Sequence, residues 1–262
     1  MNRLWQDLRY GARMLRKNPG FTLIAVITLG LGIGANTAIF SVVYGVLLRP
    51  LPFPDSGRLV WLSESSPNFP TVSIAFPNFV DWQRQQKVFD HLGIYQRMSV
   101  NLTGDGDPQR LQGALTSSGI FASLGVQPIA GRLLNEEDDQ QGAAGVAVIS
   151  HGLWQRRFGG QNVINKAINL NGQTATVVGV MPPGFAFPSR IDLWASLGPV
   201  LGNPGLHIQD RGYHSGWFGV ARLKQGVTLA QATGGMDIVA QAARNQSRPA
   251  GGAQVRVVSD KL

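Results

Sequence analysis

The chain has 262 residues, no cysteine and a formal net charge of +8, and the lack of cysteine excludes a disulfide framework and a thiolate metal site. Five basic residues and one acid within residues 1–20 supply half of that charge, a distribution that favours contact with anionic lipid at a membrane face. Because no later basic cluster is interleaved with aromatic residues, the sequence disfavours nucleic acid as a partner.

The first seventeen residues are predicted to form a basic amphipathic helix that lies in the membrane interface. At about 100° per residue, the basic residues fall outside one arc of roughly 100°. That arc collects the apolar side chains of Leu4, Trp5, Leu8, Ala12 and Leu15. Asn18-Pro19-Gly20 then ends the helix. The alternative is a positively charged flank of no fixed structure.

Residues 21–48 contain no Asp, Glu, Lys, Arg or His, and this length exceeds the roughly 20 apolar residues that cross a bilayer. A buried helix of a soluble protein is the alternative, but such helices rarely run this far without a charged face. A signal peptide has a shorter apolar region that ends in small residues, whereas this run ends in Leu47-Leu48-Arg49-Pro50. The preceding basic residues predict a cytoplasmic N-terminus.

Small residues recur within the predicted span at every fourth position. Gly30, Gly34 and Ala38 form a smooth strip against which another transmembrane helix can approach closely, and Asn36 is able to hydrogen-bond across such a contact. A glycine-rich helix that faces lipid is the alternative. Residues 30–35 also match the dinucleotide fingerprint G-x-G-x-x-A, but no strand-turn-helix unit surrounds them.

The remaining chain is predicted to be an α+β domain of two subdomains, with helices on one face of small sheets. A helix is predicted from Pro77 as far as Leu92, and others at residues 119–124, 152–158 and 228–244. Asn171-Gly172 predicts a two-residue hairpin turn, and Thr228 with Gln231 a capping box. Strands are predicted at residues 59–62, 94–102, 110–116, 145–149, 167–170, 174–180, 192–195, 217–223 and 254–258.

Searches for chemistry assign no catalytic residue, cofactor site or metal ligand. The histidines are scattered, and the nearest approach to a cluster is His207 and His214 with Asp210. Ser150 follows a strand but lacks the glycine of a nucleophile elbow, so we interpret it as a helix N-cap. The acidic run at residues 136–139 is interpreted as a solvated loop or a first helical turn. The chain carries no P-loop motif, so any ATP hydrolysis requires another subunit.

Several segments, in order along nearly the whole chain, resemble the MacB-like periplasmic core domain of bacterial ABC-transporter permeases, especially the duplicated orphan permeases of acidobacteria. They are residues 7–15 (DLRYGARML), 18–22 (NPGFT), 29–40 (LGLGIGANTAIF), 48–52 (LRPLP), 121–126 (FASLGV), 131–132 (GR), 148–154 (VISHGLW), 171–172 (NG), 178–182 (VGVMP) and 221–228 (ARLKQGVT).

The resemblance implies one transmembrane helix followed by a periplasmic domain with a porter-like β-α-β part and a smaller inserted subdomain. It implies an inner-membrane permease component, of the type with an FtsX-like membrane region, that couples ATPase-driven motion to export or release of an extracytoplasmic substrate. The implied partners are lipid, a P-loop ATPase subunit, further transmembrane helices and a second copy. The alternative function is a stand-alone, membrane-anchored periplasmic binding or sensor module without transport activity.

The predicted organisation is therefore an interfacial helix at residues 1–20, a span at 21–48 and a periplasmic domain at 49–262. Such permeases continue into three more transmembrane helices, whereas this sequence stops at Leu262; a fragment, a truncated gene and a free-standing domain remain open. The membrane-interface or ATPase-facing residues are Leu4, Trp5, Leu8, Arg9, Arg13 and Arg16. The residues expected to pack the span against other helices are Gly30, Gly34, Asn36 and Ala38.

Overall fold

The computed structural model describes residues 2–43, 51–66, 68–104, 106–203, 208–246 and 254–258. The chain divides into two compact units, Met1–Pro50 and Leu51–Leu262. The first unit holds helices α1 (Asn2–Lys17) and α2 (Pro19–Val43). The predicted end of the span at residues 44–48 and the candidate ligand His207 lie outside the described residues.

The break between α1 and α2 occurs at Asn18, as the sequence predicts. Pro19 opens α2, a position where its missing N–H has no helical partner in any case. The Thr22 hydroxyl donates to the carbonyl oxygens of Leu15 at 2.7 Å and Asn18 at 3.0 Å, and so ties the two helices together at the bend. Within α2, Pro19–Ser41 is long and apolar enough to cross a membrane, by length and composition.

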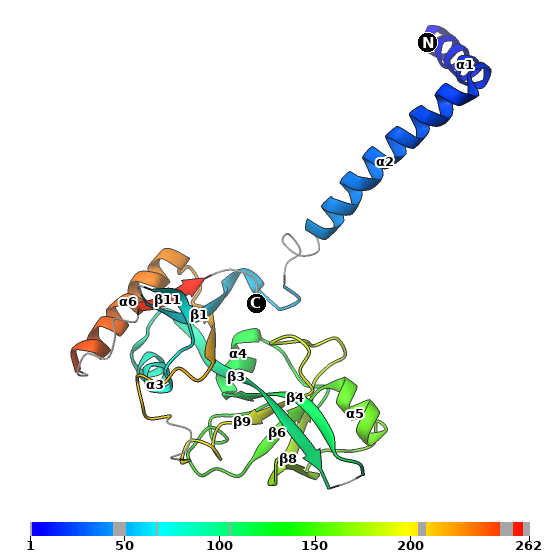
Figure 1. The fold of residues 1–262 in the computed structure, drawn as a ribbon. Helices are drawn as coiled ribbons and strands as arrows, with labels where there is room; N and C mark the ends of the chain where they lie inside the picture. The colour runs from blue at the N-terminus through cyan, green and yellow to red at the C-terminus, as the bar shows by residue number, and fades with distance from the viewer. Residues whose placement is uncertain are drawn as a thin grey trace. The chain divides into compact units, whose positions relative to one another are not determined.

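The second unit is built on one sheet that joins eleven strands among the described residues (Figure 1). The strand order is β11-β1-β10-β3-β4-β9-β6-β8-β5, with β2 beside β1 and β7 bridging β3 and β8. The strands are β1 (Leu59–Ser66), β2 (Phe69–Val72), β3 (Phe89–Thr103), β4 (Gln109–Thr116), β5 (Ala130–Gly131), β6 (Val146–Ile149), β7 (Ala167–Leu170), β8 (Gln173–Val180), β9 (Leu193–Ser196), β10 (Trp217–Leu223) and β11 (Gln254–Val258).

Strand β3 connects the two halves of this sheet because it is long enough to pair twice. Residues 89–96 pair with β10, whereas residues 95–102 pair with β4. The mixed α+β class predicted from the sequence is confirmed, but the strands expected in small sheets join one sheet, whose two halves share β3. The helices of this unit are η2 (Ser56–Arg58), α3 (Phe76–Gln85), α4 (Ser118–Leu124), α5 (His151–Phe158) and α6 (Leu229–Gln246).

Each half of the sheet has its own apolar core. Helices α3 and α6 lie beside the β1–β10 half (Figure 1). Their residues Trp82 and Met236 are almost fully buried against β1, β3 and β10. Helix α5 covers the other half, where Leu153 packs on side chains of β6 and β8. Helix α4 lies against β3 and β10 between the two cores.

Three local predictions are confirmed. Asn171 and Gly172 both have positive φ in a two-residue turn that joins Leu170 to Gln173. The Ser150 hydroxyl accepts a hydrogen bond from the Leu153 N–H at 3.1 Å, as an N-cap does. The Thr228 and Gln231 side chains bond reciprocally with each other's backbone N–H groups.

Two predictions are wrong. Helix α3 ends at Gln85, and Phe89 and Leu92, which the sequence analysis places on that helix, belong to β3. The reason is that the Gln86 side chain accepts from the Phe89 N–H at 2.8 Å and turns the chain into the strand.

The acidic run at residues 136–139 is solvated only in its first half, because Glu136 and Glu137 are exposed whereas Asp138 and Asp139 are not. Asp138 is only 7% exposed and forms a two-pronged ion pair with Arg132. The Asp139 carboxylate accepts from the Ser118 N–H and hydroxyl at the start of α4. Both acids therefore act as internal hydrogen-bond acceptors.

Candidate functional site

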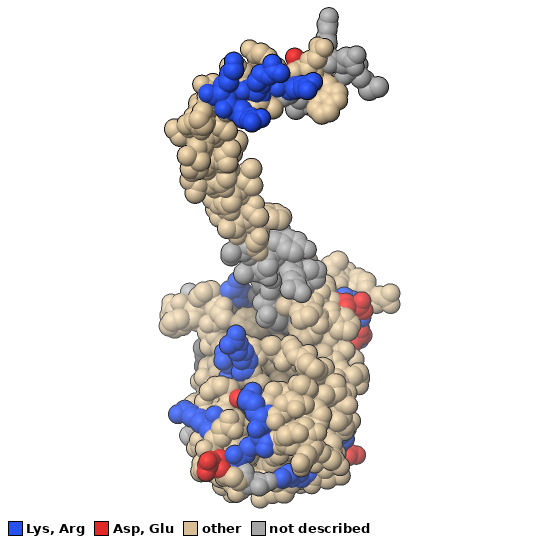
Figure 2. Space-filling view, turned by 90° about the vertical axis from the view of Figure 1, so that its right-hand side faces the viewer, with Lys and Arg blue, Asp and Glu red and all other residues tan. Residues whose placement is uncertain are grey.

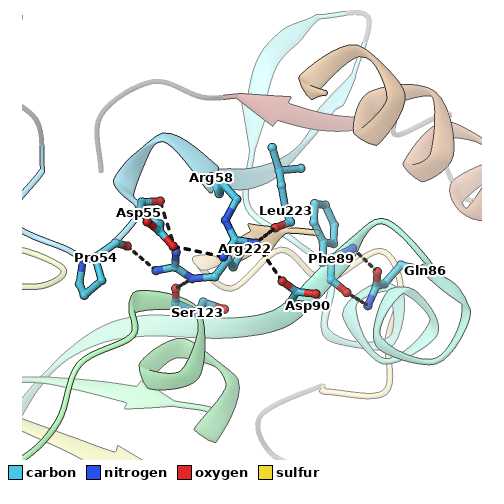
Figure 3. A network of polar contacts seen from close by, with 9 residues as sticks. All are labelled: Pro54, Asp55, Arg58, Gln86, Phe89, Asp90, Ser123, Arg222 and Leu223. Atoms are coloured by element: carbon cyan, nitrogen blue, oxygen red, sulfur yellow. Dashed lines mark hydrogen bonds and ion pairs between the residues drawn. The ribbon is translucent and has the colours of Figure 1, made fainter. Parts of the chain in front are cut away.

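The second unit, Leu51–Leu262, is called the outer unit below. A network of two arginines attaches its first residues to its sheet. We call it the arginine clamp. The clamp segment is residues 54–58, which follow the apolar span in the sequence. Figure 3 shows side chains from η2, β3, α4 and β10 converging on this segment. The clamp consists of Pro54, Asp55, Arg58, Asp90, Ser123, Arg222 and Leu223.

Arg222 of β10 is the centre of the clamp and is only 6% exposed. Its Nε donates to the Ser123 carbonyl oxygen at 2.8 Å, and Nη2 donates to the Pro54 carbonyl oxygen at 2.8 Å. A longer bond of 3.3 Å joins Nη1 to the Asp55 carbonyl oxygen. Ser123 lies in the last turn of α4, where exposed carbonyl groups favour a cation. One guanidinium thus joins β10, α4 and the residues 54–55.

Gly125 makes room for this guanidinium. It ends α4 in the left-handed conformation, with φ 67°. A Cβ atom at this position would lie 3.3 Å from Arg222 Nη2 and 3.8 Å from the Pro54 ring. Glycine therefore serves both the backbone conformation and the close approach.

Arg58 forms the second half of the clamp. Its Nη1 donates to Asp90 Oδ2 at 3.0 Å and to the Leu223 carbonyl oxygen at 2.9 Å, and Nη2 lies 3.4 Å from Asp55 Oδ2. Asp90 reaches Arg58 because it is an extra residue in β3, between His91, which pairs with Arg222, and Phe89, which pairs with Leu223. Such a β-bulge redirects the side chain it carries.

Burial and nearby charges both act on Arg222. Loss of hydration lowers its pKa from the ordinary value, and the positive charge of Arg58 lowers it further, whereas Asp55 and Asp90 raise it. Arginine stays charged under these conditions. The Arg222 guanidinium is therefore a permanent charge whose bonds to water are replaced by bonds to carbonyl oxygens. Loss of one of these bonds is costly, because it leaves a buried charged donor without a partner.

The first and the last described strands of the sheet are neighbours. Strand β1, which follows the clamp segment, pairs antiparallel with β11, the last described strand, and Trp61 lies opposite Val258 (Figure 1). The beginning of β1 and the end of β11 consequently lie side by side. The clamp segment is therefore bonded to β10 directly and to α4 through Arg222. Within the described residues, no group of three metal-binding side chains is present.

The residues selected on α1 and α2 belong to the first unit and lie apart from the clamp in sequence. Trp5 is 72% exposed on α1, and nothing lies within 4 Å of a Cβ atom built on Gly30 or Gly34. The Asn36 amide donates to the Gly32 carbonyl oxygen of its own helix at 2.9 Å. Figure 2 shows basic side chains of α1 gathered next to α2, which carries no charged residue. The assigned roles of these residues stay predictions.

His214, one member of the weak histidine cluster, contacts residues outside that cluster. His214 Nδ1 lies 2.5 Å from the Ser73 carbonyl oxygen and 3.9 Å from Glu64 Oε2. Burial raises the pKa of Glu64 above its ordinary value, although bonds from Asn78 and the Ala75 N–H act in the opposite direction.

The clamp was missed by the sequence analysis, although one signal was present. Arg222 is the sole charged residue of an otherwise apolar strand, Trp217–Leu223, and a charge at such a position indicates a buried polar contact. No comparable sequence signal marks Asp90 or Ser123, because their contacts with Arg58 and Arg222 are formed only by the tertiary fold.

Comparisons with solved structures give the same fold. A domain of a protein described as a permease from Porphyromonas gingivalis has a TM-score of 0.58 at 16% identity, covering 80% of this chain and 93% of that one. The periplasmic region of MacB from Actinobacillus actinomycetemcomitans has a TM-score of 0.56 at 15% identity, covering 78% and 89%. The extracellular domain of the noncanonic ABC-type transporter YknZ from Gram-positive bacteria has a TM-score of 0.54 at 12% identity, covering 76% and 99%.

A search of curated proteins finds no match. The sequence profile of the MacB-like periplasmic core domain, in contrast, matches residues 22–238, which include most of α2 and extend into α6. This match spans more than half of the sequence and agrees with the fold of the structural neighbours. The chain therefore belongs to the family of MacB-like periplasmic core domains.

Proposed function

We propose that this chain is the membrane-anchored permease component of an ABC-type exporter. In this proposal α2 spans the inner membrane, α1 lies on the cytoplasmic face, and the unit from residue 51 is periplasmic. A separate P-loop ATPase drives motion that the outer unit converts into export or release of an extracytoplasmic substrate. The observation that carries the proposal is the arginine clamp, which bonds the segment after α2 to the central strands.

The clamp supports coupling because it bonds residues 54–58, which follow the predicted span in sequence, to β3 and β10. Phe53 adds an apolar contact to the same segment, since its ring packs on Phe185 at a ring-centroid distance of 6.2 Å. With both arginines in place, displacement of the segment pulls on β10 through Arg222 and on β3 through Asp90. A sensor that only binds a ligand would not need this reinforcement.

The orientation and partners follow from charge and surface. The basic residues of α1 favour the cytoplasmic side, where Arg9, Arg13 and Arg16 would meet lipid phosphates or the ATPase. The strip of Gly30, Gly34 and Ala38 would receive further transmembrane helices or a second copy, because small residues let helix backbones approach closely.

The test is co-purification of the full chain from native membranes in mild detergent. We expect a P-loop ATPase, identified by mass spectrometry, together with vanadate-sensitive ATP hydrolysis in the eluate. The triple variant R9Q/R13Q/R16Q should lose both. The charge-matched control R84Q/R97Q/R110Q changes exposed arginines of the outer unit and should retain both.

Two outcomes would contradict the proposal. If the wild-type chain brings down no P-loop ATPase while remaining folded and membrane-bound, a stand-alone anchored binding or sensor module becomes the better account. If both triple variants lose the ATPase equally, the effect comes from net charge, and α1 has no special role.

A further inference from the structure

Residues 210–216, which precede β10, are attached to α3 by an arginine, and we call them the strap. Arg211 Nη1 donates to Asn78 Oδ1 at 2.5 Å, and Nη2 donates to Asp81 Oδ2 at 2.6 Å. Because arginine presents its donors in a fixed planar fork, these two bonds set the position of the first end of the strap on the helix.

The second end of the strap is attached to Ser73, just before α3. His214 Nδ1 lies 2.5 Å from the Ser73 carbonyl oxygen, and the Gly216 N–H donates to the Ser73 hydroxyl at 3.1 Å. A carbonyl oxygen only accepts hydrogen bonds, so Nδ1 of His214 carries a hydrogen, and Nε2 is the nitrogen that gains or loses a proton. The side chain of His214 is 28% exposed, so water can reach it.

Glu64 of β1 is a buried carboxylate whose two oxygens differ in their contacts. The residue is only 2% exposed. Its Oε1 accepts from the Ala75 N–H at 3.1 Å and from the Asn78 amide at 2.8 Å. Its Oε2 is shielded from solvent, makes no hydrogen bond and lies 3.9 Å from His214 Nδ1. Because a buried charged acceptor without a partner is costly, the charge on His214 affects how well the closed strap accommodates Glu64.

The charges around this contact do not balance while His214 is neutral. Hydrogen bonds link Glu64 through Asn78 to Arg211, and Arg211 in turn pairs with Asp81. Two carboxylates therefore share one permanent cation, and a proton on His214 supplies the second positive charge. The remaining charged or titratable side chains of β1, β11, α3 and the strap bond elsewhere or are exposed: Arg256 bonds the Pro70 carbonyl oxygen, Asp210 accepts from the Gly212 N–H, and Arg84 and Tyr213 are exposed.

We propose that the strap is a pH-dependent latch, which is held closed when His214 is protonated and loosens when His214 loses this proton. In the closed position, the imidazolium compensates the buried carboxylate of Glu64. Without the proton, opening of the strap restores water to Glu64, so the open state becomes more populated as the pH rises through about 5 to 8, where histidine titrates. The latch does not depend on the proposed coupling role.

A proton bound by Glu64 itself would act in the same direction. Burial raises the pKa of Glu64 above its ordinary value, so a protonated Glu64 also favours the closed strap, and this effect is likewise lost as the pH rises. The experiment must therefore distinguish His214 from Glu64 as the group that titrates.

The experiment is hydrogen exchange of the full chain in nanodiscs at about pH 5.5 and about pH 8, with each rate divided by the intrinsic rate at that pH. We expect peptides that cover residues 210–216 to be about 3- to 10-fold more protected at the lower pH, since one partner of the ion pair is buried. His214→Asn keeps an amide donor for the Ser73 carbonyl oxygen but cannot be protonated, and it should lose this difference. Glu64→Gln keeps an acceptor for Asn78 and should also lose it.

The matched control is His151→Gln, at the start of α5, which should keep the wild-type difference. The proposal is overturned if the wild-type strap is equally protected at both pH values, or if the control loses the difference as His214→Asn does. It is also overturned if His214→Asn keeps the difference, because Glu64 or a more distant group would then be the one that titrates. His214 is partly exposed, so His214→Asn decides the outcome even if Glu64→Gln fails to fold.

Discussion

Replacement of Arg222 by methionine tests the arginine clamp at its centre. Methionine keeps much of the side-chain length but removes every donor, so the carbonyl oxygens of Ser123, Pro54 and Asp55 lose their shared partner. Hydrogen bonds to a charged group contribute about 1.5–3 kcal/mol each. Two of the three are short, and release of the buried charge offsets part of the loss. We expect a net destabilisation of about 3 kcal/mol.

The assay is thermal unfolding of the full chain, followed by near-UV circular dichroism. For a unit of this size, about 3 kcal/mol lowers the midpoint by about 6–12 °C. Trypsin cleavage after Arg58 should also become faster, because Pro54 and Asp55 lose their bonds to Arg222 and only the bonds of Arg58 itself to Asp90 and Leu223 still hold the segment. The unfolding midpoint of Arg222→Lys should lie between those of the wild type and Arg222→Met. The matched control is Arg97→Met, on an exposed arginine of β3. An unchanged midpoint in Arg222→Met, equal to that of the control, would refute the reasoning.

Three other predictions address single residues. Burial raises the pKa of Asp139 from 3.8 to about 6, so the folded protein binds this proton more tightly than the unfolded chain does. Proton binding therefore stabilises the folded state at low pH by at most about 3 kcal/mol. This contribution is lost as the pH rises from about 4 past 6. Asp139→Asn, which can still accept from Ser118, should flatten the pH dependence in urea unfolding; an unchanged slope would exclude Asp139 as its source. Ser150→Ala should lower stability by about 1 kcal/mol through loss of the cap on α5 and abolish no activity, whereas loss of a hydrolase activity would show Ser150 to be a nucleophile. Gly34→Leu should weaken assembly with partner helices, and unchanged co-purification would argue against the small-residue strip.

The features that the sequence predicts well depend on residues close together in the chain. The Ser150 cap involves an N–H three residues away, and the capping box and the Asn171-Gly172 turn are equally local. The break at Asn18 follows from the covalent structure of Pro19. In each case, the interaction that decides the structure lies within the window that the pattern covers.

The features that it misses depend on distant partners. Arg222 bonds Pro54, which lies 168 residues earlier, and no local pattern connects the two. The end of α3 was missed because Phe89 and Leu92 continue a helical spacing, although tertiary pairing with β10 places them in a strand. The sequence analysis interprets Asp138 as solvated, because its burial depends on packing and on the ion pair with Arg132, which the local sequence does not show.

The candidate site shows the same division. The sequence indicates that the chain resembles a permease domain, and it singles out residues of α1 and α2 for contact with lipid, ATPase and helices. The residues that fasten the segment 54–58 to the sheet can be identified only in the fold, where β3, α4 and β10 meet. A lone arginine in the apolar strand Trp217–Leu223 was the one sign available beforehand.

The most direct test of the coupling role needs no knowledge of the substrate. In the complex with its ATPase, hydrogen exchange of the outer unit is measured with and without ATP, for the wild-type chain and Arg222→Met. The account predicts that ATP changes protection in β1, β10 and β11 of the wild type, and that Arg222→Met loses this change while ATP hydrolysis continues. If the wild-type complex hydrolyses ATP with no change in these strands, or if both chains change alike, the clamp does not couple the span to the outer unit.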